Sequence, residues 1–410
     1  LLEEWLTPDG RYISGEPPQD GRQGHFGGNL VSFIMYQHHQ CHVTQPLLHE
    51  QLQEFGVDIS AGQINHFLTE NLESFHDEKD EILKVGLEVS SYVQVDDTGA
   101  RHDGKNGYCT YIGNDLFAWY GSTGSKSRIN FLELLSAEKI QYRLSTKAFD
   151  YLVEENLSNQ VIKKLRSSTR RVFKSQTEWQ EHLTLLGISR VRHVRIITEA
   201  ALYGGLIFAG FNSDLVILSD DAGQFNIPLQ PHALCWIHAE RAIKRLVPMT
   251  DRQREDQSEI ANDFWQLYRA LKDYQERPTK RRRQQIEHNF DDLFKRRTSF
   301  ESLNLALKRI YANRTELLMV LSHPALPLHN NSAESDIREY VKRRKVSGGT
   351  RSECGQRSRD TFTALKKTCR KLGISYWLYL RDRLAKAGKI NYLPALIREA
   401  VLMPSLTAAS

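Results

Sequence analysis

Two short apolar runs, each followed at once by a pair of aspartates, constrain the fold of this chain most strongly. The chain reads Ser-Tyr-Val-Gln-Val-Asp-Asp up to Asp97 and Leu-Val-Ile-Leu-Ser-Asp-Asp up to Asp221. Short runs rich in β-branched residues are typical of buried strands. Helical apolar spacing dominates much of the remaining chain, so the sequence predicts an α/β fold class.

A third acidic residue, Glu334, lies in His-Asn-Asn-Ser-Ala-Glu and opens a helical stretch. Asp96, Asp220 and Glu334 are 124 and 114 residues apart along the chain. Two strand ends and one helix start can bring three such carboxylates together. Carboxylate oxygens bind hard divalent cations such as Mg²⁺ or Mn²⁺, and two such ions can stabilise both oxygens of an in-line phosphoryl displacement.

The second aspartate of each pair remains an alternative to the first as a member of this site. Adjacent strand residues point to opposite faces, so only one residue of each pair, Asp96 or Asp97 and Asp220 or Asp221, can point into a shared site. Periodicity alone does not decide between them.

Length and composition favour a large globular protein without a membrane partner. A chain of 410 residues with 40% hydrophobic content can form two or three domains. Its longest apolar stretch, residues 200–211, is well short of the roughly 20 residues that cross a bilayer. The five scattered cysteines indicate a reducing compartment, here the cytoplasm. The first residues resemble neither a signal peptide nor a native start, so we expect N-terminal sequence to be missing.

Charge is informative through its clustering. The net charge of +5 does not by itself indicate nucleic acid. Basic clusters recur, however, at a density that can follow a phosphate backbone, although basic runs are also common on solvated helix faces. They are Lys163-Lys164-Leu-Arg166, Arg170-Arg171, Lys280 to Arg283, Lys295 to Arg297 and Lys342 to Lys345.

The chain divides into four regions on composition. Residues 1–25, rich in Gly, Pro and charge, are expected to form a loop or arm. Residues 26–85 contain three stretches of helical apolar spacing, Leu30–Gln37, Pro46–Phe55 and Ala61–Asn71. Gly56 supplies a turn and Ser60 an N-cap, which outlines a helix-turn-helix whose second helix would enter a major groove.

Residues 86–350 are expected to form the catalytic domain, and 351–410 a C-terminal helical region. Three strand candidates, a helix near Ser127–Ala137 and the strand Leu215–Ser219, lying beside the first, follow the order of a ribonuclease-H-like core. Residues of about 141–198 and 236–320 are predicted to be helical insertions in this core.

Several motifs match, in order, those of one known family. They are Asp-Asp-Thr-Gly from Asp96, Cys-Trp-Ile-His-Ala-Glu-Arg from Cys235 after Asp220, Asn-Asn-Ser-Ala-Glu up to Glu334, the pair Arg344-Lys345, and Thr-Cys-x-x-Leu-Gly-Ile from Thr368 with Tyr-Leu-Arg from Tyr379. On these residues the chain resembles the insertion-sequence-sixty-six family of bacterial DDE transposases. It departs from the family pattern at Asp97, His329 and Ser335, where the family has glutamate, aspartate and arginine.

The resemblance implies a DNA transposase that cleaves at element ends and joins them to target DNA. It implies a ribonuclease-H-like fold and two Mg²⁺ or Mn²⁺ ions, with Asp96 bridging them and Asp220 and Glu334 each holding one. The implied partners are element ends and target DNA, the implied location is the bacterial nucleoid, and two ends held together imply a homodimer or higher oligomer. The alternatives are a catalytically inactive DNA-binding protein or repressor, and a nuclease that does not join strands.

Residues near Glu334 are candidate DNA contacts. They are His238, Asn331, Arg338, Arg344 and Lys345. Capping of the helix is an alternative role for one of the asparagines there. Cys235 and His238 have half of a zinc-site spacing but no second pair nearby, so we expect them to pack at a helix start.

Overall fold

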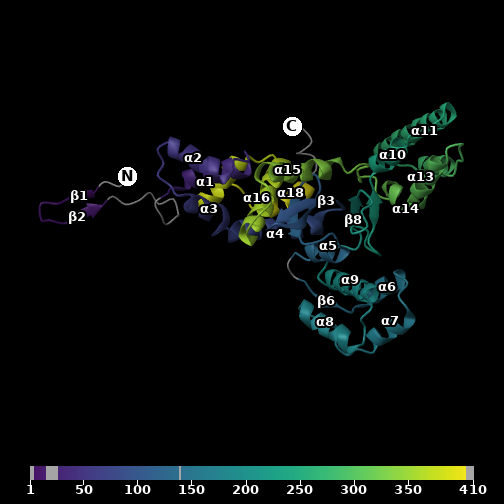
Figure 1. Cartoon of the computed structure of the whole chain (residues 1–410), viewed down its shortest axis with the longest axis horizontal. Coiled ribbons are helices and arrows are strands. Elements are labelled where there is room, and N and C mark those ends of the chain that lie inside the picture. The colour runs from purple at the N-terminus through teal and green to yellow at the C-terminus, as the bar shows by residue number, and fades with distance from the viewer. Residues whose placement is uncertain (1–3, 15–25, 138–139, 403–410) are drawn as a thin grey trace.

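A mixed five-stranded sheet lies at the centre of the computed structural model, which describes residues 4–14, 26–137 and 140–402 (Figure 1). The strand order is β5-β4-β3-β8-β9, with β3, β4 and β5 antiparallel and with β8 and β9 parallel to β3. The strands are β3 (Tyr92–His102), β4 (Lys105–Gly113), β5 (Ala118–Thr123), β8 (Val216–Ser219) and β9 (His232–Leu234). The expected α/β class is confirmed.

The strand predictions hold, with two differences. All three expected antiparallel strands form, and β8 pairs beside β3 as predicted. β3 does not end at the aspartates, because residues through His102 continue to pair with β4. The edge strand β9 was not predicted, since three residues after Pro231 are too few to show a period.

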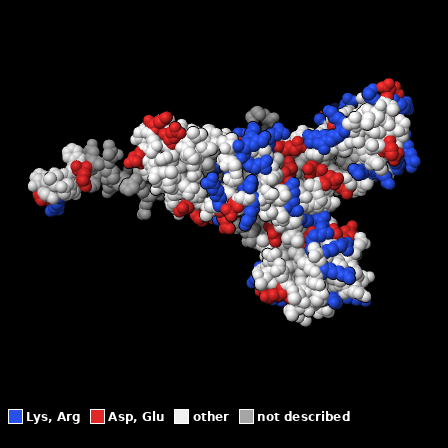
Figure 2. Space-filling model, viewed as in Figure 1, with Lys and Arg blue, Asp and Glu red and all other residues white. Residues whose placement is uncertain are grey.

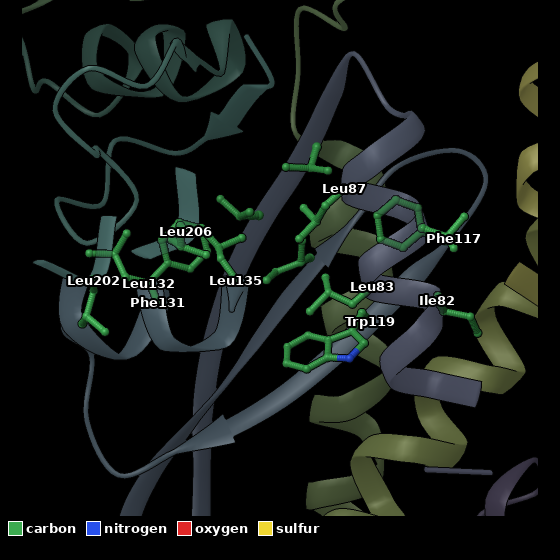
Figure 3. Packing of buried hydrophobic residues seen from close by; sticks show 14 of the residues in the cluster. Ile82, Leu83, Leu87, Phe117, Trp119, Phe131, Leu132, Leu135, Leu202 and Leu206 are labelled. Atoms are coloured by element: carbon green, nitrogen blue, oxygen red, sulfur yellow. The ribbon is translucent and has the colours of Figure 1, made fainter. Parts of the chain in front are cut away.

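One face of the sheet carries the largest apolar core. Helices α4 (Glu73–Val89), α5 (Arg128–Leu135) and α9 (Val191–Phe208) contribute to this core, together with Val93 and Val95 of β3. Figure 3 shows Trp119 of β5 beside Leu83 of α4. Gly86 of α4 allows a close approach there, since a Cβ atom at that position would lie 2.5 Å from the ring of Phe117. Ser127 caps α5, so the helix predicted at Ser127–Ala137 is confirmed.

The opposite face of the sheet packs against α15 (Asn331–Ser347), with α16 (Glu353–Lys371) along β5. Tyr111, Tyr120 and Tyr340 are buried there. Buried ion pairs join the two helices, among them Lys366 to Glu339 at 2.8 Å and Lys371 to Asp336 at 2.8 Å. The start of α15 is thereby held rigidly against the sheet.

The predicted N-terminal helices form α1 (Gly28–His39), α2 (Gln45–Glu54) and α3 (Ala61–Thr69). Gly56 turns the chain with φ of 74°, and the Ser60 side chain accepts a hydrogen bond from the Gln63 N–H, as expected for an N-cap. In the region expected to be a loop or arm, β1 (Glu4–Leu6) and β2 (Tyr12–Ser14) pair as a hairpin, while residues 15–25 lie outside the described residues.

A first lobe, residues 141–208, extends from the sheet between α5 and β8 (Figure 1). Tyr142, Phe173 and Trp179 form its aromatic core. Besides α9 it contains β6 (Tyr142–Arg143), α6 (Thr146–Glu154), α7 (Asn159–Arg166), β7 (Val172–Phe173) and α8 (Gln176–Leu185).

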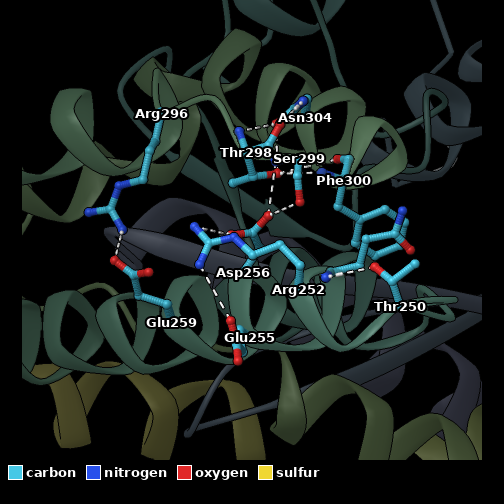
Figure 4. Close-up of polar contacts among 11 residues, drawn as sticks. Thr250, Arg252, Glu255, Asp256, Glu259, Arg296, Thr298, Ser299, Phe300 and Asn304 are labelled. Atoms are coloured by element: carbon cyan, nitrogen blue, oxygen red, sulfur yellow. Dashed lines mark hydrogen bonds and ion pairs between the residues drawn. The ribbon is translucent and has the colours of Figure 1, made fainter.

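A second lobe, residues 236–321, follows β9 and has its own apolar core. Buried Asp256 lies on the longest helix of this lobe, α11 (Asp251–Glu276), and accepts hydrogen bonds from the backbone N–H and the hydroxyl of Ser299 (Figure 4). These bonds hold the segment just before α13 (Glu301–Ala312) against α11. The lobe comprises α10 (Trp236–Lys244), α11 (Asp251–Glu276), α12 (Lys280–Phe294), α13 (Glu301–Ala312), α14 (Arg314–Leu317) and the 3₁₀ turn η1 (Met319–Leu321).

Within the described residues, three helices follow residue 352, as expected: α16, α17 (Tyr376–Ala385) and α18 (Leu393–Leu402). They pack on α1, α3 and α4, so that the N-terminal and C-terminal helices share one core. Among the described helices, none combines the length and apolar character that crossing a bilayer demands.

Candidate active site

The neighbouring parallel strands β3 and β8 bring two of the predicted acids close together, Asp96 within β3 and Asp220 directly after the end of β8. Gln94 pairs with Leu218 at the last paired position, and Asp96 and Asp220 each follow two residues later along their chain segments, Asp220 just beyond β8. Residues of equal parity in paired parallel strands point to the same face. Asp96 therefore belongs to the face that α15 covers, and Asp220 directly follows the end of β8 beside it.

Asp97 points to the other face of β3. Its carboxylate forms an ion pair with Lys126 and accepts a hydrogen bond of 2.6 Å from the side chain of Gln224. Asp96 instead pairs with Tyr111, a residue of the face covered by α15. The register thus separates the two aspartates, with Asp96 on the side of Glu334.

Asp220 and Asp221 also diverge. The Asp220 carboxylate accepts a hydrogen bond from the Ala222 N–H at 3.2 Å, which turns the chain after β8. Asp221 has a left-handed backbone with φ of 77° and accepts a hydrogen bond of 3.3 Å from the amide of Asn313. Burial raises the pKa of Asp221. Its partner lies in the second lobe, away from Asp96.

The segment before α15 is fastened to both neighbouring elements. The Asn330 amide donates 2.8 Å to the carbonyl of Val95 on β3, and the Asn330 N–H donates 3.2 Å to the Sγ atom of Cys235. The Gln94 amide donates 3.0 Å to the carbonyl of His329. Cys235 is buried at the N-cap of α10, as expected from packing at a helix start. These bonds position the first turn of α15, which contains Glu334.

Glu334 interacts with α10 rather than with the two aspartates. Its Oε1 atom lies 3.4 Å from a guanidinium nitrogen of Arg241 and 3.7 Å from Nε2 of His238. Arg241 and His238 are themselves 3.2 Å apart. The cation of Arg241 therefore offsets part of the negative charge that three neighbouring acids bring to this edge of the sheet.

The electrostatics of Asp96 show how crowded with negative charge the site is. Burial is the main cause that raises the pKa of Asp96 to about 7, against the opposing hydrogen bond from the Asp97 N–H. Repulsion from Asp220, Asp97 and Glu334 contributes to the rise. A carboxylate in such surroundings binds either a proton or a cation.

The donor set fits a hard divalent cation, since buried oxygens with excess negative charge are what such an ion stabilises. Within residues 4–14, 26–137 and 140–402, however, no three His, Cys, Asp or Glu side chains converge as a ready ligand set. Instead, Asp96 and Asp220 each accept a hydrogen bond from a nearby backbone N–H, and Glu334 forms an ion pair with Arg241.

A cavity of about 410 Å³ opens beside Asp220, between α10 and α13. His238, Ala242 and Leu305 line it, and Arg309 lies at its wall. The Nδ1 atom of His238 is buried without a hydrogen-bond partner among the described residues. The second lobe therefore leaves room for a ligand next to the acids.

Comparison with known proteins gives the family. The model of the family described as "Transposase IS66 family" matches residues 160–358, a range that contains Asp220 and Glu334 but not Asp96. "Uncharacterized protein y4jO" of Sinorhizobium fredii (strain NBRC 101917 / NGR234) is 41% identical over 319 residues, which cover 77% of this chain and 99% of that protein. The chain belongs to the IS66 transposase family. The resemblance read from the sequence motifs is confirmed.

The five predicted DNA contacts of this IS66 family member are spread along α10 and α15. Asn331, Arg338 and Lys345 are exposed at seven-residue spacing, so they share one side of α15. His238 lies beside Glu334, whereas Arg344 donates a hydrogen bond to the carbonyl of Gly99 on β3. The exposed stripe, completed by Ser335 and Lys342, is about 21 Å long at 1.5 Å per residue.

Sequence reasoning missed three partners of the acids. Arg241 was visible in the motif that starts at Cys235, three residues after His238 and thus on the same helix face. Lys126 lies in the segment Gly121-Ser-Thr-Gly-Ser-Lys126, which shows no sequence sign of a carboxylate partner. Gln224 gave no sequence signal, because its contact with Asp97 spans 127 residues.

Proposed function

We propose that this IS66 family member is an active DNA transposase that cleaves at element ends and transfers the freed strand into target DNA. The observation that carries the proposal is the proximity of Asp96 on β3 and Asp220 just after the neighbouring strand β8, with Glu334 in the helix that covers the face of Asp96. The pKa of Asp96, raised by burial to about 7, supports a site built to receive a cation.

A ribonuclease-H-like catalytic domain is the fold that this proposal assigns to residues 86–350. The strand order β5-β4-β3-β8-β9, with three antiparallel strands followed by two parallel ones, supports it. We assign DNA binding to the helical region 26–85, and treat the two lobes as insertions in the catalytic domain and residues 351–410 as its helical cap.

The residues of the site have two proposed roles: some hold the ions that stabilise charge, and others position the DNA. Bound at the three acids, two Mg²⁺ or Mn²⁺ ions supply Lewis-acid stabilisation of the attacking and leaving oxygens. Arg241 holds the Glu334 side chain beside the site through an ion pair. Cationic Arg338 and Lys345, with the exposed amide of Asn331, orient the DNA backbone along α15. His238 and Arg344 contact the phosphates closest to the acids.

The test is an assay on DNA carrying the inverted repeats that flank the coding region, with Mg²⁺ or Mn²⁺. We expect nicked ends and joined products from the unmodified protein. Asp96→Asn, Asp220→Asn and Glu334→Gln are each expected to lower the rate by on the order of 10³-fold, because each removes charge that stabilises the transition state. Asp97→Asn and Asp221→Asn are the matched controls and are expected to retain activity.

Other outcomes decide between the alternatives. DNA binding without cleavage would identify an inactive, transposase-derived DNA-binding protein or repressor. Free ends without joined products would identify a nuclease. Loss of activity in Asp97→Asn, with activity kept in Asp96→Asn, would show that the triad has been assigned to the wrong face of β3.

A further inference from the structure

A second cavity, remote in sequence from the acids, lies between the N-terminal helices and the junction of α15 with α16. Its volume is about 630 Å³. The lining is mostly polar and comes from both sides of the junction: Gln45 and Asn65 from α2 and α3, and Arg343, Arg351, Ser352 and Arg359 from the end of α15 and the start of α16. Segments almost 300 residues apart in sequence therefore build one concave surface.

Two of these arginines are buried without a carboxylate partner. Arg343 is 5% exposed and Arg359 is 7% exposed. Arg343 contacts the Nδ1 atom of His39 at 2.9 Å, while Arg359 donates to the carbonyl of Gly348 at 3.1 Å and to the hydroxyl of Ser347 at 3.2 Å. Within the described part of the chain, neither guanidinium forms an ion pair.

Such an arrangement costs stability unless an anion is bound. A buried charge is normally paired, and a pair of like charges adds repulsion. Burial, together with the charge of Arg359, lowers the pKa of Arg343 to about 10. Asp360 attracts Arg343 from a distance but forms an ion pair with neither arginine, and its carboxylate accepts two hydrogen bonds from Ser122.

The surroundings complete a site for a phosphate group. Ser352 caps the 19-residue helix α16, so the positive end of that helix dipole lies at the same junction. Arg351 is exposed at the mouth of the cavity and forms no ion pair or hydrogen bond with any described residue. Guanidinium groups that surround a concave polar surface are suited to bidentate recognition of phosphate.

We propose that this cavity binds a backbone phosphate of duplex DNA and so sets the position of the duplex relative to α3. The proposal rests on the proposed function and assigns a contact to it. Duplex DNA is favoured over a free anion because the wall opposite the arginines belongs to α2 and α3, a helix pair joined by the turn at Gly56. Asn65 is exposed on α3, next to the cavity. A helix in a major groove is flanked by the phosphates that such a cavity can hold.

The experiment measures binding of the full chain to duplex DNA as a function of salt, without divalent cations, so that cleavage does not take place. The variants are Arg351→Gln, which changes an exposed side chain, and the double variant Arg351→Gln/Arg359→Gln. Arg398→Gln is the matched control, because Arg398 is exposed on α18 and pairs with Glu88 instead of lining the cavity. Circular dichroism checks the fold of each variant.

We expect Arg351→Gln to weaken binding and the double variant to weaken it about tenfold or more, as for loss of charge-assisted hydrogen bonds. The slope of log K against log salt should fall by about 0.9 in the double variant, which corresponds to one phosphate. Arg398→Gln should keep the slope and the affinity.

Two results would overturn the inference and leave the transposase proposal standing. One is a folded Arg351→Gln and double variant with the salt slope of the unmodified protein. The other is stabilisation of the protein by inorganic phosphate, lost in the double variant, together with unchanged DNA binding, which would identify a free anion as the ligand. Failure of the unmodified protein to bind any duplex would overturn both proposals.

Discussion

Asp96 shows what a sequence can and cannot determine at the scale of one residue. Its motif and its family resemblance selected it over Asp97, but the side of the strand to which each points depends on register, which a run of alternating residues near a strand end does not reveal. In the structure the pairing with Tyr111 and the contact of Asp97 with Lys126 separate the two. The choice therefore depends on a hairpin partner that has no signal in the motif itself.

The raised pKa of Asp96 predicts an unusual dependence of stability on pH. The folded protein holds this proton up to about pH 7, whereas the unfolded chain releases it near the ordinary aspartate pKa of 3.8. Between these values the folded state binds more protons, so the free energy of unfolding falls as pH rises and levels off above pH 7. Asp96→Asn removes this loss, which is at most about 4 kcal/mol at 1.4 kcal/mol per pKa unit.

Thermal unfolding at pH 5 and pH 8 measures this prediction. Relative to the unmodified protein, Asp96→Asn should gain stability toward pH 8, whereas Asp150→Asn, an exposed aspartate on α6, should not. Mg²⁺ should raise the melting temperature of the unmodified protein more at pH 8 than at pH 5, because it competes with the proton at Asp96. Identical pH profiles for the unmodified protein and Asp96→Asn would contradict a raised pKa of Asp96.

At the scale of elements, local signals predicted the helices and distant contacts decided their arrangement. Ser60 and Ser127 mark helix starts that the structure confirms. The bonds that fix α15 were not predictable, since Asn330 reaches Val95 across 235 residues. The same holds for the packing of α4 on the closing helices.

Glu78 of α4 joins that helix to α17 and α18 and gives a prediction about stability. It is 1% exposed and accepts hydrogen bonds from Arg383, from the Tyr379 hydroxyl and from the Leu393 N–H, at 2.7 to 3.0 Å. Arg383→Ala leaves this charge buried without its cation, which should cost about 3–5 kcal/mol of unfolding free energy.

An exposed ion pair between α4 and α18 offers a matched control. Arg398 of α18 pairs with Glu88 of α4 at 2.6 Å, but both side chains are largely exposed, at 42% and 57%. Arg398→Ala should therefore cost less than about 1 kcal/mol. Urea denaturation measures both variants, and equal losses would show that burial of Glu78 is not what makes its pair important.

At the scale of the whole molecule, the charge is unevenly placed while the total is small. Lys and Arg gather on the first lobe and along the middle of the molecule (Figure 2). Between Asn159 and Thr177 the chain has six lysines and arginines and no acidic residue. Ile162 and Leu165 are buried, so Lys163 and Lys164 of α7 face solvent. The sequence predicted these clusters, but it could not tell whether they share a surface.

If DNA bound at the acidic site continues along the first lobe, the exposed lysines of this lobe contribute to affinity through counterion release. Lys163, Lys164 and Lys174 are exposed and have no ion pair or side-chain hydrogen bond within the described residues. Changing all three to Gln should leave unfolding free energy within about 0.5 kcal/mol. The salt slope of DNA binding should fall by about 0.9 for each phosphate contact that is lost.

The control for this variant removes the same net charge from another surface. Lys386, Lys389 and Arg398 lie on or after α17 and on α18, away from the first lobe, and their combined change to Gln also lowers the net charge of +5 by three. A general attraction between a basic protein and DNA would reduce both slopes alike. A smaller slope in the lobe variant alone, measured by fluorescence anisotropy with duplex DNA, would show that the path of the DNA crosses the first lobe, since only charge within a Debye length of the phosphates releases their counterions.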